Sequence, residues 1–189
     1  MKTKILSMLV AMSMVAVLFS CSKKEESPAD GNESELITTV RLRFSEGGTS
    51  QTFTYRDLDG AGGNAPVIDA IRLANGKNYS LELEVLDESN PSKIGNITEE
   101  IFEEGYEHQF FFTGTAAANL LSLSYADKDK NNNPIGLKNS VMTKATGNGI
   151  LTVILRHKPN KAGAGVANGQ VANAGGETDI EVNFNVTVQ

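Results

Sequence analysis

Apolar and polar residues alternate along most of the chain after residue 35. The clearest segment is 179–188, where five apolar residues alternate with five polar ones, and segments 40–44 and 79–85 follow the same pattern. A period of two turns successive side chains to opposite faces of a strand, so these segments are predicted to be half-buried β-strands. Weaker runs predict further strands at 51–57, 67–73, 108–112, 120–125, 137–143 and 150–157.

Two segments also carry helical signals. Asn64 and Pro66 before segment 67–73, with Gly76 after it, fit the start and stop of a helix. The β-branched residues of this segment dilute its helical propensity, so a strand is predicted there. The other segment, 96–105, opens with Asn-Ile-Thr-Glu, which is similar to a capping box. It predicts one or two helical turns that cross between sheets.

The number and length of these segments predict the fold class. Nine short strands, separated by Gly, Asn, Asp and Pro clusters within residues 36–189, are typical of an all-β antiparallel sandwich. We therefore expect an immunoglobulin- or fibronectin-like β-sandwich of eight or nine strands. The chain lacks the Cys…Trp…Cys pattern of true immunoglobulin domains. A sheet closed into a barrel is the alternative, because the period alone does not distinguish the two arrangements.

The first twenty residues have the pattern of a targeting segment. Lys2 and Lys4 precede the uncharged, apolar stretch 5–19, which is too short to span a membrane. The stretch ends in Leu-Phe-Ser-Cys, which resembles the lipobox of bacterial lipoproteins. The resemblance implies a signal peptide over 1–20 and acylation of Cys21, through which the mature chain would be held on a lipid bilayer. An ordinary secretory signal with a cysteine at its edge is the alternative.

Residues 21–35 are predicted to be the lipidated cysteine and a disordered tether. Residues 22–35 hold one proline and no other apolar residue larger than alanine, so this segment cannot bury enough surface to fold. Fourteen extended residues reach roughly 45–50 Å. Lys24, Glu25 and Glu26 resemble the short export signal of Bacteroidota surface lipoproteins, which implies a place on the cell surface. A solvated linker that faces the periplasm is the alternative.

Charge and cysteine content exclude several classes of function. The chain has 189 residues, with 23 acidic and 17 basic ones. Removal of residues 1–20 takes away two lysines and no acids, which leaves a formal charge of −8. The basic residues are scattered, so nucleic acid is not an expected partner. The single cysteine excludes a disulfide scaffold and a paired-cysteine metal site.

The connections between the predicted strands differ in length. In an antiparallel fold every second connection lies at the same end, and the alternation places all the long ones together. The long connections are 57–66, 87–107, 126–136 and 158–177, and the short ones are 45–50, 74–78, 113–119 and 144–149. We therefore expect a functional site at the end that carries the long connections.

Two of the long loops hold oxygen donors suited to Ca²⁺. Asp57 and Asp59 lie in the first, and Asp127, Asp129 and Asn131 occupy alternate positions in the third. Ca²⁺ takes six to eight oxygen ligands, which such a spacing can supply. Neither loop completes an EF-hand, and the same residues are ordinary turn formers. Calcium binding and turn formation are both retained as interpretations.

The two histidines of the chain are candidates for a second kind of metal site. His108 begins one predicted strand and His157 ends another, and both fall near the long connections. Imidazole and carboxylate groups together suit Zn²⁺, and Glu103, Glu104 and Glu107 precede the first histidine. Hydrogen-bonded histidines at strand ends are the alternative. Rings within about 5 Å of each other with a glutamate between them would favour the metal site, and rings far apart would rule it out.

The sequence contains no GxSxG, HExxH or Walker motif, and its one cysteine is assigned to lipid. The chain as a whole is similar to small β-sandwich lipoproteins of Bacteroidota whose function is unassigned. We predict a lipid-anchored outer-membrane protein, exposed on the surface, that acts as a non-enzymatic binding module for a metal ion, a small solute or a partner protein. An outer-membrane uptake receptor is the partner that this setting suggests. A structural or envelope-assembly lipoprotein is the alternative, and a hydrolase with an acidic pair in a cleft ranks third.

Overall fold

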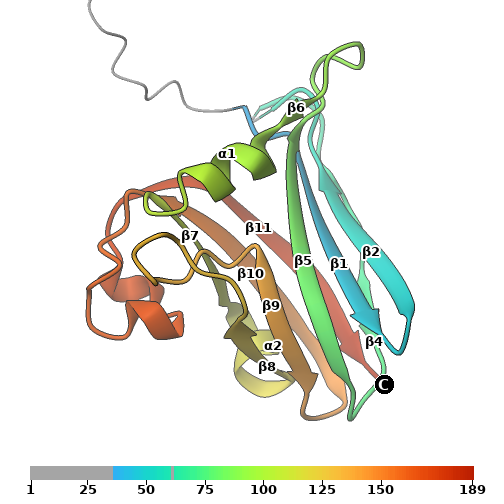
Figure 1. Ribbon diagram of the computed structural model, residues 1–189. Helices are drawn as coiled ribbons and strands as arrows, with labels where there is room; N and C mark the ends of the chain where they lie inside the picture. The colour runs from blue at the N-terminus through green and yellow to red at the C-terminus, as the bar shows by residue number, and fades with distance from the viewer. Residues whose placement is uncertain (1–35, 61) are drawn as a thin grey trace, which may run out of the picture. The chain divides into compact units, whose positions relative to one another are not determined.

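The computed structural model describes residues 36–60 and 62–189. The predicted signal peptide, Cys21 and the export signal at Lys24, Glu25 and Glu26 lie outside the described residues. Within them, two β-sheets pack face to face in a sandwich-like arrangement (Figure 1). The predicted all-β class and the sandwich are thus confirmed.

The larger sheet has seven strands. Its order is β3-β2-β1-β5-β9-β8, with β6 also paired to β5, and every pair is antiparallel. The strands are β1 (Thr39–Glu46), β2 (Thr49–Arg56), β3 (Val67–Ile68), β5 (Asn78–Asp87), β6 (Gly95–Asn96), β8 (Leu121–Tyr125) and β9 (Lys138–Thr143).

The smaller sheet has four strands in the order β4-β11-β10-β7. The strands are β4 (Ile71–Leu73), β7 (His108–Thr113), β10 (Gly147–His157) and β11 (Glu177–Val188). Strand β4 runs parallel to β11, and the other pairs are antiparallel. One parallel pair therefore departs from the antiparallel arrangement that the sequence predicts.

The core lies between the two sheets and is built from the alternating apolar residues. Leu81 and Val85 of β5 and Phe184 of β11 are completely buried, whereas Glu82 and Glu84 face outward from the same strand. Full burial of one such apolar side chain contributes about 1.5–3 kcal/mol relative to leaving it in water. The alternation of apolar and polar residues thus determines which face of these strands packs into the core.

The segment predicted as one strand over 67–73 divides into β3 and β4, which belong to different sheets. Asp69 causes the break, because its backbone NH donates to the carbonyl of Thr54 while its carboxylate accepts from the Thr54 NH, at 2.9 and 2.8 Å. The chain then turns inward and buries Ile71 and Leu73. This division and the extra strand β6 make eleven strands among the described residues instead of eight or nine.

Two short α-helices connect strands. Helix α1 (Ile97–Glu103) fulfils the helical prediction and buries Ile97 and Ile101, although the side chain of Asn96 bonds Glu99 and caps no backbone group. Helix α2 (Gly114–Asn119) occupies a segment predicted as a plain connection, and Gly114 begins it with a φ of 88°. No helix among residues 36–60 and 62–189 is long and apolar enough to cross a membrane.

The long connections gather at one end of the sandwich, as the strand alternation predicts. They are residues 57–66, 88–107, 126–137 and 158–176, and they meet where β2, β5, β8 and β10 end. In Figure 1 this end carries α1 and the loop that follows β10. We call it the long-loop end.

Candidate metal site at the long-loop end

The two histidines lie side by side at the long-loop end. His108 is the first residue of β7 and His157 is the last residue of β10, and the strand register pairs them directly. Their imidazole rings are stacked, with centroids 4.8 Å apart and planes 8° apart. The rings are as close as the sequence-based prediction requires, but the acid that faces both rings is Asp179 of β11 and not the expected glutamate.

A β-bulge brings Asp179 to the histidines. Leu155 of β10 pairs with Ile180, but Arg156 pairs with Thr178, so Asp179 has no partner across the ladder. An extra residue of this kind bends the strand and redirects a side chain. Simple alternation with Ile180 and Val182 would turn Asp179 to the outer face, whereas the bulge lets its carboxylate face both rings.

Two glycines just before β11 make this approach feasible. Gly175 and Gly176 have φ values of 59° and 70°, in the left-handed region that favours glycine. A Cβ atom on Gly176 would collide with the carbonyl oxygen of His157, whereas one on Gly175 would meet open space. Gly176 therefore allows the loop to return closely past His157 into β11.

The outer edges of the two rings are held by different groups. Nδ1 of His108 lies 3.3 Å from the carbonyl oxygen of Glu104, which can only accept, so Nδ1 carries the proton. Nε2 of His157 faces a carboxylate oxygen of Glu107 at 3.6 Å. These contacts leave Nε2 of His108 and Nδ1 of His157 facing the two oxygens of Asp179, at 4.0 and 3.9 Å.

The electrostatics of the cluster favour a cation at its centre. Burial lowers the pKa of His108, which favours the neutral imidazole that a metal requires. Burial also raises the pKa of Asp179, although His157 acts to lower it. The separations between Asp179 and the rings exceed hydrogen-bond length. The carboxylate is therefore partly desolvated while its nearest polar neighbours stand too far away to bond it.

The donor atoms are close enough to share an ion once the side chains move inward. One donor atom from each of His108, His157 and Asp179 lies within 4.8 Å of the other two. Two donors on one tetrahedral Zn²⁺, at about 2.0–2.2 Å each, stand roughly 3.4 Å apart. The donors must therefore approach one another by up to about 1.4 Å, and the stacked rings must tilt so that both nitrogen lone pairs point at one ion. Among the residues that the structure describes, this is the only cluster of three such side chains.

The candidate calcium ligands of the first long loop bond groups within that loop or at the end of β2. Asp59 accepts from the backbone NH and the side-chain amide of Asn64, at 2.9 and 2.6 Å. These bonds lower the pKa of Asp59. Asp57 accepts from the hydroxyl of Tyr55 at 3.3 Å. Both contacts are ordinary turn and strand-end chemistry, and the structure does not bring these two acids into one cluster with those of the third loop.

The candidates in the third long loop are likewise engaged. Asp127 accepts from two backbone amides, and one oxygen of Asp129 accepts from the NH groups of Asn131 and Asn133. The other oxygen of Asp129 accepts from the ammonium of Lys161 at 3.0 Å. Lys161 thus places a positive charge where a Ca²⁺ ion would have to sit beside Asp129. Asn131 contacts Asp129 through its backbone NH.

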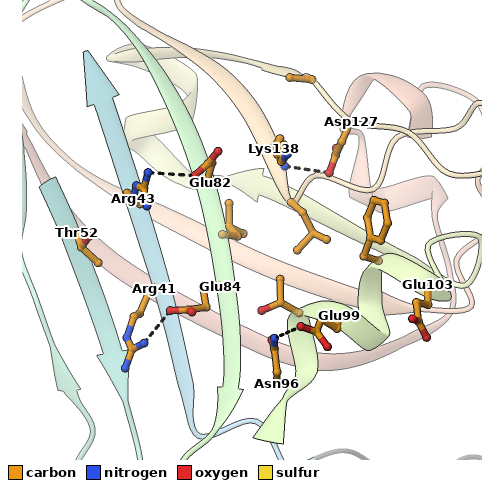
Figure 2. A pocket seen from close by; sticks show the side chains of 15 residues that line it. Arg41, Arg43, Thr52, Glu82, Glu84, Asn96, Glu99, Glu103, Asp127 and Lys138 are labelled. Carbon is orange, nitrogen blue, oxygen red and sulfur yellow. Dashed lines mark hydrogen bonds and ion pairs between the residues drawn. The ribbon is translucent and has the colours of Figure 1, made fainter. Parts of the chain in front are cut away.

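A separate open groove of about 1020 Å³ lies on the outer face of the larger sheet, next to α1. Figure 2 shows Arg41 paired with Glu84 and Arg43 with Glu82 along it, and Asn96 bonded to Glu99. The charged groups on the strands therefore satisfy one another across the sheet. They do not converge on a common point in the way the histidine cluster does.

Sequence reasoning named His108 and His157 but missed Asp179. The alternating pattern of the last strand actively points Asp179 away from the histidines, so only the adjacent Gly175 and Gly176 hint at a local distortion. The fold and the cluster define a class, namely a β-sandwich with a two-histidine, one-carboxylate cluster at one end. No protein-family model matches the chain, and no curated protein matches its sequence.

Proposed function

We propose that the long-loop end captures a divalent transition-metal ion through Nε2 of His108, Nδ1 of His157 and the carboxylate of Asp179. The observation that carries this proposal is the convergence of these donors from three strands, with the other ring nitrogen of each histidine turned toward an outer partner. Such outer contacts orient metal-bound histidines in proteins. Imidazole donors favour Zn²⁺ and its neighbours over Ca²⁺, which prefers oxygen.

The proposed setting is a lipoprotein anchored to the outer membrane and exposed on the cell surface. Acylation of Cys21 and export through Lys24, Glu25 and Glu26 are supported by the sequence before the folded region. In this setting the protein acts as a non-enzymatic module that holds the ion for an outer-membrane uptake receptor. The two packed sheets support an immunoglobulin- or fibronectin-like relationship, which stays part of the proposal.

Zinc titration of the full mature chain in detergent tests metal capture. We expect one Zn²⁺ per chain by calorimetry, with affinity reduced at least tenfold in each of His108→Ala, His157→Ala and Asp179→Ala. Asp59→Ala serves as the matched control, because it removes an acid of another long loop, and it should bind Zn²⁺ like the wild type. Zinc binding that survives all three cluster substitutions, or no binding by the folded wild type, would overturn the proposal.

Membrane attachment has its own test. Labelled palmitate should be incorporated into the wild-type chain in cells, and Cys21→Ala should move the protein out of the membrane fraction. Protease added to intact cells should remove the folded region if it faces outward. A chain that takes up no palmitate, or that fractionates alike with and without Cys21, would refute lipid anchoring and leave the metal proposal intact.

A second candidate function, envelope assembly with a protein partner, is favoured by one observation. Most of the large apolar side chains that are exposed lie at the long-loop end. They are Leu36, Leu58, Val67, Ile68, Ile94, Phe102 and Tyr106. Exposed apolar groups mark an interaction surface where they form one contiguous patch. Crosslinking in intact cells would favour this candidate if Phe102→Ser abolishes one specific adduct while Met142→Ser, at the opposite end, leaves it unchanged.

A further inference from the structure

The cluster offers three protein donors, and a zinc-type ion takes at least four ligands. Glu107 is a further acid beside the cluster, but it faces Nε2 of His157, on the ring edge opposite the Nδ1 that faces Asp179. The two nitrogens of an imidazole point away from each other, so one ion cannot contact both Nδ1 and Glu107 while the ring stays in place. Among the described residues, no fourth histidine, cysteine, aspartate or glutamate side chain joins the cluster.

The missing position lies on the solvent side of the cluster. The side chain of His108 is 6% exposed, that of His157 is 15% exposed and that of Asp179 is 24% exposed, so access increases from the first histidine to the acid. The strands of the smaller sheet close the other side, because His108 and His157 are paired in the ladder and β11 lies beside β10. A small molecule can therefore reach the ion past His157 and Asp179 without displacing core residues.

The charge around the site favours an anion at that position. A divalent ion with two neutral imidazoles and one carboxylate keeps a net charge of +1. Lys158 follows His157 directly and is 58% exposed, with its ammonium 3.7 Å from Glu107. Its φ of 50° is unusual for a residue with a side chain, and its backbone NH donates to the Glu107 carbonyl at 2.6 Å. The turn places Lys158 beside the exposed edge of the cluster, where its ammonium offsets the negative charge of Glu107 and leaves the charge of the ion itself for an incoming anion.

We infer that an ion held by His108, His157 and Asp179 keeps an open coordination position that takes a small monoanionic donor, such as a carboxylate. This inference rests on the proposed function. The protein would then carry the metal together with an exogenous ligand, and the ion would exchange by replacement of that ligand. Sites with three protein donors and one exchangeable position behave in this way, whereas sites closed by four protein donors do not.

Cobalt substitution tests the open position. The full mature chain in detergent is loaded with one equivalent of Co²⁺, and azide is added while the visible absorption of the Co²⁺ ion is recorded. We expect a saturable change that fits one azide per Co²⁺. With both proteins saturated with Co²⁺, Lys158→Met should weaken azide binding about two- to fivefold, the effect of one exposed charge. Lys93→Met, an exposed lysine in another loop, is the matched control and should bind azide like the wild type.

The outcomes separate the two proposals. If Co²⁺ binds but azide does not change its absorption spectrum, the site is closed. The inference of an open position is then overturned, while metal capture stands. If the folded chain binds no Co²⁺ and no Zn²⁺, the proposed function fails and this inference fails with it. A spectral change of equal strength in wild type and Lys158→Met retains the open position but overturns the role given to Lys158.

Discussion

The ammonium of Lys161 lies 3.0 Å from the carboxylate of Asp129, and both side chains are almost completely buried, at 6% and 1% exposed. The same ammonium donates to the carbonyl oxygens of Gly105 and Pro134. One side chain from loop 158–176 thus ties down two other long loops. The arrangement holds the long-loop end together around the segment that contains Glu104 and Glu107.

The first prediction concerns this buried pair. Lys161→Met leaves the Asp129 carboxylate buried without its charged partner and should lower the free energy of unfolding by about 3–5 kcal/mol. Chemical denaturation of the full mature chain measures the change. Lys93→Met, which removes an exposed lysine, should stay within about 0.5 kcal/mol of the wild type.

The double variant Lys161→Met with Asp129→Asn sharpens that test. Removal of the second charge also removes the penalty for an isolated buried carboxylate, so part of the lost stability should return. If Lys161→Met alone costs less than about 0.5 kcal/mol, the pair does not hold the loops together.

The second prediction concerns the pH dependence of stability at Glu88. This carboxylate is 7% exposed and lies 2.8 Å from the guanidinium groups of both Arg41 and Arg56. Burial acts to raise its pKa, but the hydroxyl of Thr39 and the two arginines outweigh burial and leave the pKa lowered. Because the folded state lowers this pKa, Glu88 stabilises the protein above its unfolded pKa, and the contribution is lost as the pH falls through the folded value.

Glu88→Gln should therefore lower the free energy of unfolding by about 2 kcal/mol near neutral pH. The difference from wild type should shrink as the pH falls below the ordinary glutamate pKa of about 4.3 and on through the lowered pKa of the folded state. Urea denaturation at several pH values measures both effects. Glu84→Gln removes a more exposed partner of Arg41 and should change stability by no more than about 1 kcal/mol. A Glu88→Gln penalty that does not vary with pH would contradict the assignment.

The sequence pattern predicts most strands because burial of alternating apolar residues determines their faces. Strand β5 and strand β11 follow this rule along their apolar positions. The pattern fails at 67–73, where a mostly apolar segment interrupted by Asp69 and Arg72 hides a change of sheet. There the carboxylate of Asp69 replaces a ladder partner at Thr54, and a side-chain bond of this kind has no hydrophobic period to reveal it.

The candidate site could be predicted only in part for a related reason. His108 begins β7 and His157 ends β10, so the alternation of strand direction along the chain is enough to bring them to the same end. Asp179 joins them through a register shift between Leu155 and Arg156, which depends on the return path of loop 158–176. The bulge reverses the face that alternation assigns to Asp179, and no local rule of sequence gives the position of such a bulge.

The third prediction tests that return path with a matched pair of glycines. Gly176→Ala places a methyl group against the carbonyl oxygen of His157 in a left-handed conformation, whereas Gly175→Ala has the same conformational cost but open space. We expect Gly175→Ala to cost about 1–2 kcal/mol of stability. Gly176→Ala should cost more and should also weaken Zn²⁺ binding, because the bulge that carries Asp179 follows it directly.

Equal stability and equal Zn²⁺ affinity of the two glycine variants would show that the close approach at Gly176 does not position Asp179. Calorimetric titration at a temperature where both variants remain folded separates loss of the site from loss of the fold.

The fourth prediction concerns Glu107 as a positioning residue for His157. Its carboxylate faces Nε2 of His157 at 3.6 Å and therefore favours the tautomer that presents Nδ1 to Asp179. Glu107→Gln keeps the size of the side chain and removes its charge. Loss of such an outer partner typically lowers metal affinity by about 10–100-fold, and we expect a fall of about tenfold for Zn²⁺.

Nitrogen NMR of the histidine rings measures the tautomer of His157, which would not change if Glu107 only stabilised the fold. In the metal-free wild type, His157 should carry its proton mainly on Nε2, and Glu107→Gln should shift the population toward the Nδ1 tautomer. Glu103→Gln removes an acid at the end of α1 and should change neither the tautomer nor the affinity. If Glu107→Gln leaves both at their wild-type values, the ring of His157 is oriented by its place in the ladder opposite His108, and Glu107 has no part in the site.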